Sequence, residues 1–165
     1  MYPWMVYVHV LAVFAFLLTH GVSSAIALRM RGNRDPDLAR AWMRVYLESP
    51  YYFAGLYIPL LILLITGIIS AFMGQWWGHG WVWLSLAILI GIIVSMFYFA
   101  FGYFTKLRKS LGMPYMENRK VQPPMAPASP EEIDAIMADS PAILLTVIGF
   151  GGIAVILWLM MFKPF

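Results

Sequence analysis

The sequence predicts an all-α protein, a four-helix transmembrane bundle that forms a single membrane domain over residues 1–165. The first reason is the placement of charge: except for Lys163, every Lys, Arg, Asp and Glu lies within residues 29–48 or 106–139. The apolar runs between them can cross a hydrocarbon core about 30 Å thick, where a charge would cost several kcal/mol. The second reason is the hydrophobic content of 62% with a mean hydropathy of +0.77, which exceeds that of soluble domains.

Four apolar runs mark the membrane-spanning helices, at about residues 4–28, 51–73, 81–105 and 142–162. Pro3 stands just before the first run, at a position where its missing N–H is harmless. Pro59 lies inside the second run, where it removes a backbone hydrogen bond and predicts a kink.

The orientation follows from the connecting segments. Segments 29–50 and 106–141 are rich in Arg and Lys, whereas the connection 74–80 has neither. Positive residues favour the cytoplasmic side, so both long segments are expected to be cytoplasmic and both termini outside. Every tryptophan except Trp42 would then gather at the outer headgroup level.

Each cytoplasmic segment contains one predicted short helix at the membrane interface. In residues 37–48 the spacing of Leu38, Trp42 and Val45 marks an apolar face. In the second segment Ser129 is the expected N-cap, followed by Pro130 and by an apolar face of Ile133, Ile136 and Met137. The prolines between Leu111 and Ala128 indicate an extended, mobile linker.

Composition also limits the chemistry. The net charge of +3 comes from the connecting segments, so it favours contact with anionic lipid and gives no case for nucleic acid. With no cysteine, disulfides and thiol chemistry are excluded. No Asp, Glu, Lys or Arg lies inside a predicted span, which disfavours charge transport. Whether any metal binds stays open.

The three histidines are the candidate cofactor-binding residues. His9 and His20 are 11 residues apart on the first helix, which places them within roughly 20° of each other and about 16 Å apart along the axis. His79 lies in the connection 74–80, at a depth where it could meet His9. Such histidines can bind haem b or a chlorin pigment between helices. They can equally make structural hydrogen bonds, and the glycines near them are ordinary packing residues.

The opening of the chain, from Met1 through Trp4 to the stretch His9 to Val13, resembles the first helix of small bacterial four-helix membrane proteins. These are grouped around the HemJ-type protoporphyrinogen oxidase and the copper resistance protein D membrane domain. The resemblance implies an integral protein of the bacterial inner membrane, in which His9 would be a haem or metal ligand. The last three helices resemble that group only in length and topology, and they lack its intramembrane basic residues.

These observations favour a non-catalytic accessory or structural subunit of a larger membrane complex, respiratory or photosynthetic, with lipid and other membrane subunits as partners. The sequence contains no complete set of catalytic residues, so an enzyme is the less favoured interpretation. The alternative is a b-type haem protein in electron transfer or haem-dependent oxidoreduction, using His9 with His20 or His79. A third hypothesis is a lipid- or quinone-binding protein in which Pro59 opens a lateral pocket.

Overall fold

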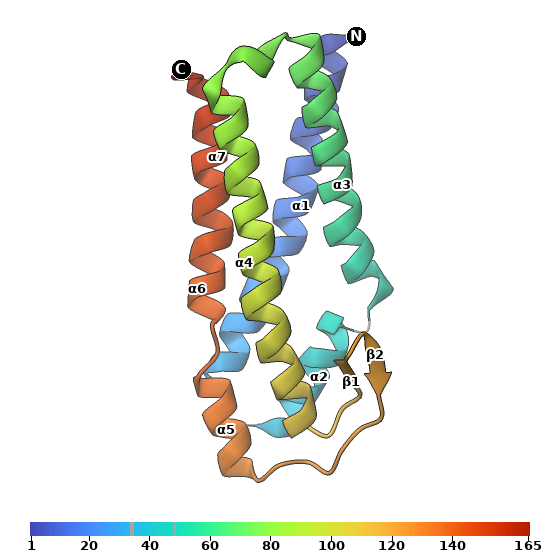
Figure 1. The fold of residues 1–165 in the computed structure, drawn as a ribbon. Coiled ribbons are helices and arrows are strands. Elements are labelled where there is room, and N and C mark those ends of the chain that lie inside the picture. Colours follow the sequence, from blue (N-terminus) through green and yellow to red (C-terminus); the bar gives the residue numbers. More distant parts are fainter. Residues whose placement is uncertain (34, 48) are drawn as a thin grey trace.

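The computed structural model describes residues 1–33, 35–47 and 49–165, and it contains the predicted four-helix bundle (Figure 1). The long helices are α1 (Tyr2–Arg31), α3 (Pro50–Met73), α4 (Gly80–Ser110) and a fourth made of α6 (Ala142–Thr146), the π-helical turn η2 (Val147–Gly151) and α7 (Gly152–Phe162). Four helices are long and apolar enough to cross a membrane. Arg34 and Glu48, two of the predicted loop charges, lie outside the described residues.

The long helices are arranged as two pairs. α3 packs along α1 and α4 packs along α7, whereas α3 and α4 hardly touch each other along their lengths. At one end of the bundle the 3-10 turn η1 (Trp76–Gly78) joins α3 to α4 beside the end of α7 (Figure 1). We call this the η1 end, and the opposite end, where α5 (Pro130–Ala138) lies, the α5 end. The boundary between α3 and α4 is called the α3–α4 seam.

A folded cap closes the α5 end. Its buried cluster joins the ends of α1 and α4 to α2 (Pro36–Leu47) and α5, with Met30, Met43, Leu107 and Met137 at its centre. The predicted face of α5 is the buried one: Ile133, Ile136 and Met137 are all in the cluster. Ser129 caps α5 as predicted, because its Oγ accepts a hydrogen bond from the Glu132 amide at 3.3 Å.

The apolar face predicted for α2 is not the face that packs into the cap. Ala39 and Met43 are fully buried, while Leu38 and Val45 are 39% and 58% exposed. Ala39 and Met43 are four residues apart and so lie on one face of the helix, which packs into the cap. The larger apolar residues Leu38 and Val45 are left on the surface of the described part of the chain.

The expectation of an extended linker at 111–128 is also wrong. Strands β1 (Tyr115–Glu117) and β2 (Lys120–Gln122) form an antiparallel hairpin there. Its two turn residues have positive φ, 51° at Asn118 and 60° at Arg119, as a tight hairpin turn requires. Tyr115 is buried, and Lys109 forms an ion pair with Glu117 at 2.8 Å. The prolines therefore flank an ordered hairpin that packs against the end of α4.

Candidate functional site

His9 lies at the contact between α1 and α3. Its Nδ1 is 3.0 Å from the carbonyl oxygen of Leu63 and 3.1 Å from Thr66 Oγ1. Gly67 makes this approach possible, because a Cβ at that position would stand 3.0 Å from His9 Cε1. Packing of the two helices through a glycine is therefore what holds the imidazole in one position.

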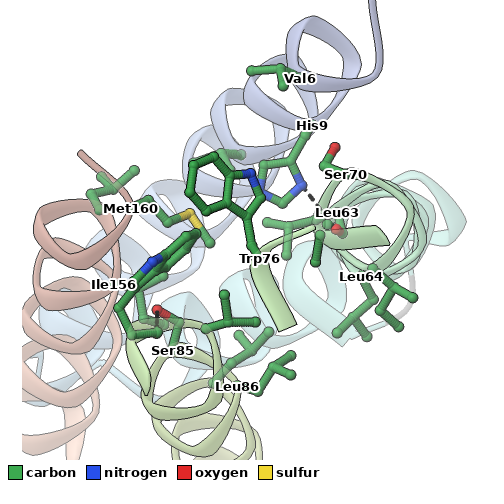
Figure 2. A pocket seen from close by; sticks show the side chains of 18 of the residues that line it. Val6, His9, Leu63, Leu64, Ser70, Trp76, Ser85, Leu86, Ile156 and Met160 are labelled. Carbon is green, nitrogen blue, oxygen red and sulfur yellow. Dashed lines mark hydrogen bonds between the residues drawn. The ribbon is translucent and has the colours of Figure 1, made fainter. Parts of the chain in front are cut away.

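The hydrogen bond to Leu63 fixes which nitrogen of His9 carries the proton. A carbonyl oxygen can only accept, so Nδ1 must be the donor. In the neutral ring Nε2 then holds the lone pair and is the nitrogen left for a ligand. His9 lines a cavity, and Figure 2 shows its ring beside the cavity with the bond to Leu63 dashed.

This cavity of 230 Å³ is lined by all four long helices and by η1. Its walls are mainly apolar, and leucines of α3 and α4 line it along the α3–α4 seam: Leu60, Leu63, Leu64, Leu86 and Leu89. The other helices contribute Val6 and Phe16 from α1, and Ile156 and Met160 from α7 (Figure 2 shows Val6, Ile156 and Met160). Such a concave apolar space with a few polar groups is typical of small-molecule sites.

Trp76 closes the cavity at the η1 end. Its indole nitrogen donates a hydrogen bond to the Tyr2 hydroxyl at 3.2 Å. The turn before it allows this position: Gln75 has a φ of 56°, and a Cβ at Gly74 would overlap the Trp76 indole. Glycine at position 74 is therefore required for the indole to lie where it does.

Three polar atoms at the η1 end of the cavity have no hydrogen-bond partner among the described residues: Ser70 Oγ, Trp77 Nε1 and Trp81 Nε1. Trp81 is the most buried of them, with 7% of its surface exposed. An indole N–H can only donate, and a buried donor without a partner costs about 1–3 kcal/mol. These atoms are therefore suited to a ligand that accepts hydrogen bonds.

Among the described residues, Lys163 is the only lysine or arginine at this end of the bundle. Its Nζ lies 4.1 Å from the centre of the Trp76 ring and 6.0 Å from that of Trp81, and the residue lines the cavity. The ammonium is thus held by cation–π contacts. Every Asp and Glu of the chain lies within residues 29–48 or 106–139, so no acidic side chain comes from η1 or from the helix ends beside it.

His20 lies in a second, tighter place. It is 9% exposed, and its Nε2 is buried without a partner in the described part of the chain. Phe16 stacks on the ring with an interplanar angle of 6°, and Phe150 tilts against it. Gly149 in the π-helical turn η2 gives it room, because a Cβ there would overlap Nε2. Turns of this kind recur at functional sites, although here the ring is tightly packed.

The structure does not bring the three predicted histidines together. His79 is exposed, contacts Trp76 with its ring centre 5.2 Å away, and does not line the cavity. His9 and His20 have separate sets of neighbours. Haem or pigment binding at any of the three stays a prediction, as does the accessory-subunit role.

Sequence reasoning missed the η1 end as a binding site. In the sequence, the connection 74–80 indicates the orientation, an outer tryptophan belt and the candidate His79, while Lys163 is simply the charge that stands apart. The two features together point to this end of the bundle. Lys163 follows the fourth predicted helix and the tryptophans follow the second, so both belong to the same end.

A comparison with known protein families, curated proteins and solved structures finds no match for this chain. The resemblance of the first helix to the HemJ-type oxidase and copper resistance protein D group therefore stays a prediction, and the site is interpreted from its own geometry.

Proposed function

We propose that this protein binds an amphiphilic molecule of the membrane in the cavity between its four long helices. The observation that carries the proposal is the cavity itself, which combines apolar walls with the buried indole N–H of Trp81, a donor that no described residue pairs with. An apolar chain would occupy the space beside Leu64 and Leu89, and an oxygen-bearing head group would accept hydrogen bonds from Trp81, Trp77 and Ser70. The proposal belongs to the same class as the lipid- or quinone-binding hypothesis that the sequence suggests.

The α3–α4 seam is the expected entry route. α3 and α4 hardly contact each other, so separating them breaks less packing than separating α1 from α3. The seam is lined on the cavity side by leucines, and in a bilayer it would face lipid chains. A ligand already dissolved in the membrane would therefore reach the cavity without crossing water.

Binding can be measured by the quenching of tryptophan fluorescence with a dibrominated stearyl alcohol, added to the protein in mild detergent. Trp76, Trp77 and Trp81 line the cavity, so a bound bromine-bearing chain should quench them saturably and near one equivalent. Unbrominated stearyl alcohol should reverse the quenching. A linear, irreversible dependence on concentration would show only partition into the micelle and would overturn the proposal.

Paired substitutions locate the binding. Leu64→Phe with Leu89→Phe fills the seam side of the cavity and should weaken binding at least about tenfold, the equivalent of 1.4 kcal/mol. The matched control is Ile90→Phe with Val94→Phe, at positions 61% and 60% exposed on α4, which should bind as the wild type does. If the two double variants are equally folded and bind equally well, the cavity is not the site.

A further inference from the structure

We infer that the head group bound at the η1 end is anionic, with Lys163 as its counter-charge. This inference rests on the proposed function and adds the chemical class of the ligand: a single-chain or multi-chain amphiphile that ends in a carboxylate, sulfate or phosphate. It follows from the type of polar group present, the position of Lys163 and the distribution of charge along the chain.

The buried polar groups of the residues that line the η1 end of the cavity can all donate a hydrogen bond. Trp77 and Trp81 each present an indole N–H that has no partner among the described residues, and an indole cannot accept. The hydroxyl of Ser70 can also donate. Tyr2 accepts from Trp76 Nε1, which leaves the Tyr2 hydroxyl proton to be donated. A head group with several acceptor oxygens would satisfy these donors together, as an oxyanion does.

Lys163 gives these donors a positive charge. Its Nζ is 4.1 Å from the centre of the Trp76 ring, so the ammonium lies directly over the residue that closes the cavity. Cation–π contact is a weak substitute for an anion, worth about 0.5–2 kcal/mol. Lys163 itself has a φ of 46°, a left-handed conformation that is unusual for lysine and ends α7 at this point.

No described aspartate or glutamate side chain is placed to neutralise Lys163, and the backbone oxygen of Phe165 at the same end accepts a hydrogen bond from the Trp81 amide at 3.4 Å. The acids closest to it in sequence are Asp139 and Asp134, and both belong to the α5 end, on the far side of the long helices. At the edge of a low-dielectric region an unneutralised ammonium attracts anions strongly, and an N⁺–H···O⁻ hydrogen bond is roughly twice as strong as a neutral one. A neutral head group would leave that attraction unused.

The test is a competition experiment with the dibrominated stearyl alcohol as the bound probe. The competitors are unbrominated stearyl alcohol, unbrominated stearyl sulfate and inorganic sulfate. Stearyl sulfate should displace the probe at a concentration about tenfold lower than stearyl alcohol does, and the ratio should shrink as salt is added. Inorganic sulfate should not displace the probe in this range, because it lacks the chain that fills the apolar walls.

Lys163 variants show whether the preference comes from this residue. Lys163→Gln should bring the two stearyl competitors to within about twofold of each other, while binding of the alcohol itself persists. Lys163→Arg should keep the preference, because arginine keeps the positive charge. His79→Gln, at an exposed position of the same turn that does not line the cavity, is the control and should compete as the wild type does.

The outcomes separate the two proposals. Equal displacement by both stearyl compounds in the wild type would overturn the anionic head group and leave the amphiphile site intact. Displacement by inorganic sulfate as effective as by stearyl sulfate would show a surface anion site and would overturn the inference of an amphiphile. If the probe does not bind saturably at all, both the proposed function and this inference are overturned.

Discussion

Replacing His20 by leucine should leave the protein at least as stable as the wild type, whereas His9→Leu should destabilise it. The two rings are on the same helix, His20 buried and His9 half-buried, and their hydrogen bonding differs. His9 Nδ1 donates to Leu63 and is near Thr66 Oγ1, while His20 Nε2 is buried without a partner in the described residues. The pair of variants therefore compares a satisfied imidazole with an unsatisfied one.

The magnitudes follow from these contacts. Removing the unpartnered Nε2 of His20 should gain about 2 kcal/mol. Losing the stack on Phe16 costs about 1 kcal/mol. Leucine is about as large as histidine, so no void term is added, and the net change is a gain of about 1 kcal/mol. His9→Leu loses its hydrogen bonds and should cost about 1–1.5 kcal/mol. The free energy of unfolding of His20→Leu should therefore be about 2 kcal/mol higher than that of His9→Leu.

The assay is equilibrium unfolding in mixed micelles of a mild detergent and dodecyl sulfate, followed by circular dichroism. A His20→Leu variant that is less stable than His9→Leu would refute the reasoning, because it would mean that His20 Nε2 holds a partner beyond the described residues. A reduced-minus-oxidised absorption spectrum then distinguishes the causes. A Soret band in the wild type that His20→Leu abolishes would identify that partner as haem.

Three further substitutions test the packing. Gly149→Ala should lower the free energy of unfolding by about 2–3 kcal/mol, because its Cβ would overlap the His20 imidazole. Gly91→Ala has open space and should raise it by up to about 1 kcal/mol. Unfolding midpoints measure both changes, and equal midpoints would contradict the overlap. Met137→Ala removes a side chain buried at 0% exposure in the cap and should cost about 2–5 kcal/mol in the same assay; a cost below about 1 kcal/mol would show that the cap is loosely packed. Gly74→Ala should displace the Trp76 indole, which closes the cavity, and so speed release of the brominated probe in stopped-flow fluorescence. Gly78→Ala has open space on the same turn and should release the probe as the wild type does. Equal release rates would show that Trp76 does not control exit.

The long helices could be predicted because the physical constraint on them is local. A run without charges reveals its own length, and the ends of α1, α3 and α4 fall within a few residues of where the apolar runs end. Capping is equally local, which is why Ser129 could be assigned as an N-cap. Neither inference depends on what the helix packs against.

The short segments were harder to predict because their partners decide the outcome. In α2 the apolar spacing of Leu38 and Val45 shows that one side is apolar, but small Ala39 allows the closer approach and is the residue that is buried. At 111–128 proline content indicated a mobile chain, yet burial of Tyr115 against the end of α4 holds a hairpin whose turn contains no glycine. Periodicity describes a face, and only the fold shows what covers it.

The candidate site illustrates the same limit and adds a chemical argument. The sequence singles out histidine because an intramembrane imidazole is rare, and it places the tryptophans as ordinary headgroup anchors. In the structure only 7% of the Trp81 surface is exposed, and its indole N–H has no hydrogen-bond partner among the described residues. A tryptophan that merely anchored the helix in the headgroups would keep its N–H in water. An indole buried beside a cavity, near a lysine that no described aspartate or glutamate pairs with, is suited to an acceptor, and the apolar cavity could hold the chain of the proposed ligand.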